Sequence, residues 1–93
     1  MRVGVLSLEI LIPGSSSLKE KRFVLRSLKD RIRKKFNVSV AEVGYQDKWQ
    51  RSQIAIALVS GDGKHIDRSF SLLLNFIETD SHIQIIHYDT HRF

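Results

Sequence analysis

The feature that most constrains the fold of this 93-residue chain is the order in which its apolar residues change period. A period of two residues is typical of a strand with one buried face, and a period near 3.6 residues is typical of a helix packed on one side. The two periods alternate in the order strand, helix, strand, strand, helix, strand. The expected strands cover residues 2–12, 38–45, 54–59 and 82–88, and the first expected helix covers residues 18–36. The second expected helix has an inner apolar stripe, which Leu72 and Phe76 broaden. The members of this stripe are Ile66, Phe70, Leu73, Leu74 and Ile77.

Local signals define the ends of the first helix. Ser17 and Glu20 have the S-x-x-E spacing of a capping box, so the helix is expected to begin there. Asn37 is expected to end it in a left-handed conformation, which asparagine tolerates. Lys21 falls within the arc of apolar residues on this helix, and we expect it to form an ion pair with Glu42 or Asp47.

The later elements carry weaker signals. The apolar phase changes near Ala41 and Glu42, which is consistent with a bulge in the second strand. Asp62 or Gly63 is expected to cap the second helix. The residues after Tyr88 are polar and are expected to be frayed.

This order of elements predicts one domain over residues 1–93. The plan is α+β and ferredoxin-like, βαββαβ, with both helices on one face of a four-stranded antiparallel sheet. Strands one and three are then central, and their outward residues form an uncovered face. Its small side chains include Val3, Val5, Ser7, Ala55, Ala57 and Val59. Apolar faces of this kind favour association with a second copy of the chain or with another protein, and we expect a homo-oligomer, most simply a dimer.

Charge is concentrated in the first helix. Residues 18–36 hold nine of the 15 Lys and Arg residues against two acidic residues, although the whole chain has a net charge of only +5. A group of these cations repeats at helical spacing beside the apolar face and forms a basic stripe. Its members are Lys19, Arg22, Arg26, Lys29 and Arg33. Cations at this spacing can follow successive phosphates, so the stripe is the predicted nucleic-acid-binding site. A solvated surface helix is the competing interpretation.

Three other groups of residues suggest chemistry. The loop from Gly14 to Ser17 precedes a helix N-terminus and can hold a phosphate, but a capped turn is the favoured interpretation. The alternating His87, Asp89 and His91 include zinc and nickel ligand types, but their terminal position and the lack of a fourth ligand argue against a metal site. Trp49, between two cations in the turn, can stack a nucleobase, but a role in anchoring the loop is favoured.

Several functions are not expected. The chain has no cysteine, which excludes disulfides and fits a cytoplasmic setting. The apolar run at the N-terminus is too short to span a bilayer. The expected central strands lack the aromatic residues with which RNA-recognition motifs stack bases, so any RNA is expected on the helix side. No residue set forms a catalytic signature, and we expect neither an enzyme nor a bound cofactor or metal.

Three linked segments carry a family resemblance. Residues 17–22 (SLKEKR), 37–44 (NVSVAEVG) and 47–51 (DKWQR) resemble the YlxP-like family of small bacterial proteins of unknown function. The resemblance implies a ferredoxin-like fold and a bacterial cytosolic setting. Members are often encoded among genes for translation initiation and ribosome maturation factors, which implies a connection to RNA or the ribosome only by association.

Two functions therefore remain open from sequence. The first is a non-enzymatic accessory protein that contacts structured RNA or a ribosomal assembly through the basic stripe. The alternative is a protein-interaction or regulatory module that dimerises through its open sheet face without nucleic acid.

Overall fold

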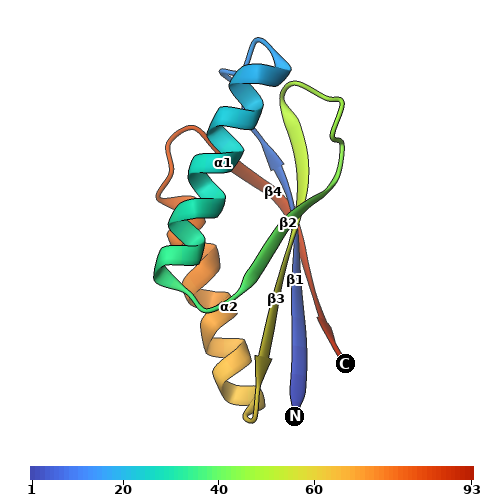
Figure 1. The fold of residues 1–93 in the computed structure, drawn as a ribbon, viewed down its shortest axis with the longest axis vertical. Helices are drawn as coiled ribbons and strands as arrows, with labels where there is room; N and C mark the ends of the chain where they lie inside the picture. The colour runs from blue at the N-terminus through green and yellow to red at the C-terminus, as the bar shows by residue number, and fades with distance from the viewer.

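The computed structural model describes all 93 residues and contains six elements in the expected order (Figure 1). They are β1 (Arg2–Leu11), α1 (Leu18–Lys35), β2 (Ser39–Gly44), β3 (Arg51–Ser60), α2 (Gly63–Glu78) and β4 (Gln84–Arg92). The strands form one antiparallel sheet in the order β2-β3-β1-β4, and both helices cover the same face. The predicted ferredoxin-like α+β fold is confirmed.

The alternation in β1 and β3 explains which face of the sheet is covered. Leu6 and Leu8 of β1 pair with Ile56 and Ile54 of β3, and all four side chains have no exposed surface. The intervening residues point to the other face, where Val5 pairs with Ala57. The predicted open face is therefore present, with the predicted side chains on it.

The helices supply the other half of the core. Leu25, Leu28 and Ile32 of α1 are buried. Of the predicted inner stripe of α2, Leu74 is half-buried and the other members are buried: Ile66, Phe70, Leu73 and Ile77. Leu72, expected to broaden that stripe, is 54% exposed instead. Close approach of α2 to β1 requires a glycine, because a Cβ at Gly4 would lie 3.0 Å from Phe70 Cζ and still closer to Ile66.

The start of α1 is as predicted, but its end is not. Ser17 is the N-cap and its Oγ accepts a hydrogen bond from the Glu20 N–H at 3.1 Å. The prediction for Asn37 is wrong, because Phe36 is the C-cap in an extended conformation and its N–H bonds to the Ile32 carbonyl. The single non-glycine residue with positive φ is Tyr45, at 56°.

The sheet is more extensive than the sequence suggested. The register between β2 and β3 shifts between Glu42 and Gly44, next to the expected bulge. The predicted fraying after Tyr88 is wrong, because β4 continues to Arg92, which pairs with Gly4. The chain ends are also joined, since the Phe93 N–H donates to the Val3 carbonyl at 2.9 Å. Backbone pairing with β1 overrides the polar composition of this segment.

Candidate nucleic-acid interface

The α1 helix displays the basic stripe on the flank next to its buried face. Lys19, Arg22, Arg26 and Arg33 are exposed, and Lys29 is half-buried. The buried side of the same helix packs on the sheet through leucine and isoleucine, which fixes the rotation of the helix about its axis. The sequence therefore located all five stripe residues on a single accessible flank.

Four of the five stripe residues have no acidic partner. No carboxylate oxygen lies within 4.0 Å of the side-chain nitrogens of Lys19, Arg22, Arg26 or Lys29. Arg33 differs, because it lies 3.7 Å from Asp30 and donates a 3.0 Å hydrogen bond to the Val40 carbonyl. The stripe is thus a patch of uncompensated positive charge at its first four positions.

Other cations of α1 have structural partners. Lys21 Nζ lies 2.9 Å from Glu42, Arg31 Nη2 lies 2.6 Å from Asp80, and Lys35 Nζ lies 4.8 Å from the centre of the Phe76 ring. The predicted Lys21–Glu42 pair is confirmed, whereas Asp47 forms no ion pair. The helix thus separates cations that hold the fold together from cations that face solvent.

The flank that carries the stripe lies beside β2, an edge strand of the sheet. Lys21 and Arg33, about three turns apart on the helix, reach two residues of that strand, Glu42 and Val40. The opposite flank contacts the segment between α2 and β4 through Arg31 and Asp80. The stripe is therefore remote from β4, at the other edge of the sheet.

The loop before α1 is occupied by a carboxylate of the protein itself. Glu20 Oε2 accepts hydrogen bonds from the Ser16 N–H at 2.7 Å and the Ser16 hydroxyl at 2.9 Å. These two bonds, the backbone bond first, lower the pKa of Glu20. The Ser15 hydroxyl donates to the Ser17 carbonyl at 3.0 Å. The capped-turn interpretation is confirmed, and these donors are not free for a phosphate.

The terminal histidines lie on the open face of the sheet. His87, Asp89 and His91 pair across from Glu9, Ser7 and Val5, so all three share that face, as expected of a strand. His87 Nε2 lies 3.0 Å from Asp89 Oδ2. No group of three His, Cys, Asp or Glu side chains is arranged to hold a metal ion. The two remaining histidines, His65 and His82, lie at the start of α2 and in the loop before β4.

Trp49 does not anchor its loop. Its side chain is 56% exposed, whereas Gln50 makes the anchoring contacts by donating to the Pro13 carbonyl at 3.2 Å and the Ser15 carbonyl at 3.0 Å. The favoured interpretation of Trp49 is therefore wrong. Trp49 instead lines a shallow hollow of about 380 Å³ with Tyr45, Lys48 and Arg51.

A second aromatic residue was missed by the sequence reasoning. Phe23 is 72% exposed on α1, four residues after Lys19 and three before Arg26. Its position outside the apolar arc of the helix was the available signal, because residues at that angle face water. Phe23 also borders a hollow of about 830 Å³ that includes Lys19 and His82.

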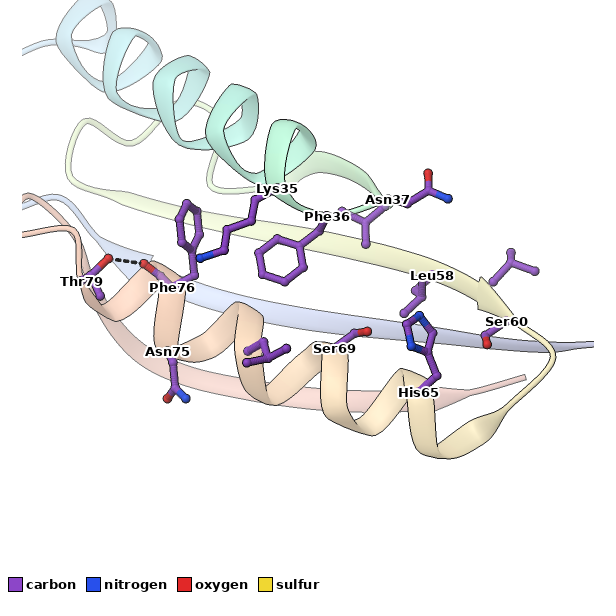
Figure 2. Close-up of a pocket in the computed structure, with 13 residues that line it drawn as sticks. Lys35, Phe36, Asn37, Leu58, Ser60, His65, Ser69, Asn75, Phe76 and Thr79 are labelled. Atoms are coloured by element: carbon purple, nitrogen blue, oxygen red, sulfur yellow. Dashed lines mark hydrogen bonds between the residues drawn. The ribbon is translucent and has the colours of Figure 1, made fainter.

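A groove between the helices was also not foreseen. It has a volume of about 620 Å³ and lies between the end of α1, the end of β3 and α2 (Figure 2). The Phe36 and Phe76 rings meet edge to face, with centroids 5.8 Å apart, and the Thr79 hydroxyl donates to the Phe76 carbonyl at 2.6 Å. The groove depends on residues distant in sequence, so no local pattern marks it.

Comparison with known proteins identifies the family. The family described as "Protein of unknown function (DUF503)" matches residues 3–90. The chain belongs to this family. Its relative "Uncharacterized protein YlxP" from Bacillus subtilis (strain 168) is 40% identical over 82 residues, which are 88% of this chain and 89% of that protein. The predicted YlxP-like resemblance is confirmed.

A solved structure of a designed protein shares the fold of this family member. The de novo designed protein Foldit4 matches all of this chain and 97% of its own length, with a TM-score of 0.55 and 14% identity. A REP-associated tyrosine transposase bound to a REP hairpin matches 98% of this chain and 55% of its own, with a TM-score of 0.47 and 12% identity. Neither helix of the present fold has the length and apolar composition needed to cross a bilayer.

Proposed function

We propose that this protein is a non-enzymatic, cytoplasmic accessory protein that contacts structured RNA or a ribosomal assembly through the basic stripe of α1. The observation that carries the proposal is the set of exposed cations without carboxylate partners on one helix flank. These cations are Lys19, Arg22, Arg26 and Lys29. A flank made only for hydration usually intersperses both signs of charge.

The dimensions of the stripe suit a polyanion. Residues 19–33 rise by about 21 Å along the helix axis, a length over which a nucleic-acid duplex presents many phosphates. Each cation that neutralises a phosphate releases counterions, so affinity falls as salt rises. An RNA duplex keeps its base edges in a deep, narrow major groove, so the stripe would mainly contact phosphates and recognition would depend on the shape of the RNA.

The test is a charge reversal designed around the contacts of α1. In the variant Arg22→Glu/Arg26→Glu, both altered side chains are exposed and make no ion pair, so folding is expected to be retained. Arg33 is left unchanged because it bonds to Val40. In filter binding at about 50 mM salt, the affinity for total ribosomal RNA should fall at least tenfold. The slope of log affinity against log salt should become less steep by an amount that corresponds to about two phosphate contacts.

The matched control reverses two cations on the other helix. Lys64 and Arg68 of α2 are exposed, lack ion pairs and have the same four-residue spacing. Lys64→Glu/Arg68→Glu changes the net charge by the same amount and should retain most of the affinity. Equal losses in the two variants would mean that only net charge matters, and retained binding in the α1 variant would reject the stripe as the contact surface.

A second candidate function is a protein-interaction or regulatory module that dimerises through the open sheet face without nucleic acid. The favouring observation is that Val3, Val5, Ala55 and Ala57 form an apolar strip with no helix over it. Four strands of up to ten residues present about 600 Å² of sheet, near the roughly 800 Å² per partner of a standard interface. Charges on this face nearly balance, because Arg51 pairs with Glu9. A second copy of the chain is thus the occupant that fits it.

A further inference from the structure

We propose that the turn between β2 and β3 binds an unpaired nucleobase of RNA, with Trp49 as the stacking platform. This inference rests on the proposed function, because the RNA backbone would follow the basic stripe. It adds a site that phosphate contacts alone do not provide. The ligand class is a single-stranded nucleotide adjoining a structured region of RNA.

The turn is held in place by groups other than Trp49. The buried Lys21 donates to the Tyr45 carbonyl at 2.6 Å, and the Lys48 N–H donates to the same oxygen at 3.0 Å. At the other end of the turn, the Gln50 carbonyl accepts from the Ile12 N–H at 2.8 Å. Trp49 makes none of these bonds, and its side chain is more than half exposed on a fixed support.

The same contacts place the turn beside the start of the basic stripe. Lys21 lies one residue before Arg22 and two after Lys19, and Gln50 bonds to Ser15 just before α1. Figure 1 shows the β2–β3 connection at the same end of the molecule as the start of α1. A chain of phosphates that follows the stripe toward the helix N-terminus would therefore reach Trp49.

The chemistry around Trp49 favours a nucleotide. Every base has a face that stacks on an indole ring, and a tryptophan bordered by cations can receive both base and phosphate. Lys48 is exposed beside it without an ion pair. Arg51 is less available for a phosphate than Lys48, because its guanidinium lies 2.6 Å from Glu9 and 4.5 Å from the centre of the Tyr45 ring. A site for an apolar protein partner would instead be a broad apolar patch without these charges.

The experiment uses the intrinsic fluorescence of Trp49, which is the only tryptophan in the chain. Four probes are titrated at about 50 mM salt: a single-stranded RNA of mixed sequence, its blunt duplex, inorganic polyphosphate and polyglutamate. Stacking on a base should quench Trp49 with the single-stranded RNA and only weakly with the other three. Trp49→Ala should weaken single-stranded RNA binding about tenfold, measured by anisotropy of a labelled RNA, and Trp49→Phe should restore most of it.

Tyr88→Ala provides the control, because Tyr88 is 51% exposed on β4, at the opposite edge of the sheet. It should bind as the wild type does. Equal quenching by polyphosphate, or unchanged RNA affinity in Trp49→Ala, would overturn the stacking site. The basic stripe would still be supported as the RNA contact if Arg22→Glu/Arg26→Glu lost binding in the same assay. If polyglutamate quenched Trp49 as strongly as the single-stranded RNA does, the ligand of this site would be an acidic protein segment and the nucleobase site would be rejected. A wild type that binds none of the RNAs would reject the proposed function itself.

Discussion

Lys21 is the only charged residue that the fold buries almost completely, with 1% of its side chain exposed. Its ammonium group is 2.9 Å from Glu42 and donates to the Tyr45 carbonyl, and Glu42 also accepts from the Ser52 hydroxyl at 2.6 Å. If one partner of a buried ion pair is removed, the charge of the other stays buried without a compensating charge, which destabilises the fold. The network thus joins α1 to the end of β2.

Lys21→Met tests the contribution of this network. Methionine keeps much of the side-chain volume but donates no hydrogen bond, so the free energy of unfolding in urea should fall by about 2–4 kcal/mol. The exposed Lys34→Met on the same helix should change it by less than about 0.5 kcal/mol. A Lys21→Met/Glu42→Gln double variant should lose less than the sum of its single variants. Additive losses would show that the pair is not coupled.

The sequence predicted the position of Lys21 but not the geometry around it. A lysine within an apolar arc indicates burial, and Glu42 was one of two candidate partners around the end of the second strand. The left-handed Tyr45 was not predicted, because the contact that holds its carbonyl comes from a residue 24 positions away. Local propensity describes the chain alone, whereas such a contact exists only after α1 has packed on the sheet.

At the scale of elements, Asp80 ties α1 to the turn that leads into β4. Arg31 Nη2 donates to Asp80 Oδ2 at 2.6 Å, and the His82 N–H donates to Oδ1 at 2.9 Å. Burial on its own would raise the pKa of Asp80, but the bond from Arg31 and the backbone bond from His82 outweigh it and hold the pKa below its usual value. The carboxylate is therefore stabilised in the folded state.

The pH dependence of stability follows from this direction. A lowered folded pKa means that the contribution of Asp80 is present above the ordinary value of 3.8 and is lost as the pH falls below it. Asp80→Asn should therefore lower the midpoint temperature of unfolding near neutral pH. Between about pH 5 and pH 2.5 the midpoint temperature of this variant should decrease less than that of the wild type. Scanning calorimetry across that range measures both effects.

Asp47→Asn is the matched control for the acid transition, because Asp47 is exposed and has no ion pair. It should follow the wild-type curve. An Asp80→Asn curve that stays parallel to the wild type across the acid range would show that Asp80 contributes no pH-dependent stability.

Element order and strand positions were predictable because the two periods of apolar residues differ strongly in β1, α1, β3 and α2. The length of β4 was not predictable, because residues such as Asp89 and His91 have polar side chains and their pairing depends on the backbone of β1. The stripe was predictable because its spacing is local to one helix. The exposure of Trp49 required the fold, since Gln50 makes its anchoring bonds to residues 37 and 35 positions earlier.

At the scale of the whole molecule, the sheet separates two surfaces of different chemistry. Both helices cover one face, and the apolar strip of β1 and β3 forms the other (Figure 1). Association through the open face and RNA contact through α1 would therefore not compete for the same residues. Their responses to salt should differ, because apolar burial is little screened and phosphate contacts are strongly screened.

Ala57→Glu tests association through the open face. It places a charge at the centre of the face, where Ala57 pairs with Val5, and should convert a dimer to a monomer in sedimentation equilibrium. Ser71→Glu, on the exposed side of α2, adds the same charge and should leave the dimer intact. Raising salt from about 50 to 200 mM should weaken RNA binding without dissociating the wild-type dimer. A wild type that sediments as a monomer would reject the interface.

The pairing of Phe93 with Val3 has a practical consequence for handling the molecule. Both ends of the polypeptide emerge at one corner, at the end of the molecule opposite the β2–β3 connection (Figure 1). Fluorophores or affinity handles fused to either terminus would sit remote from Trp49. A short linker between the termini could also close the backbone into a ring, allowing new ends to be opened in an exposed loop such as the one after Ser60.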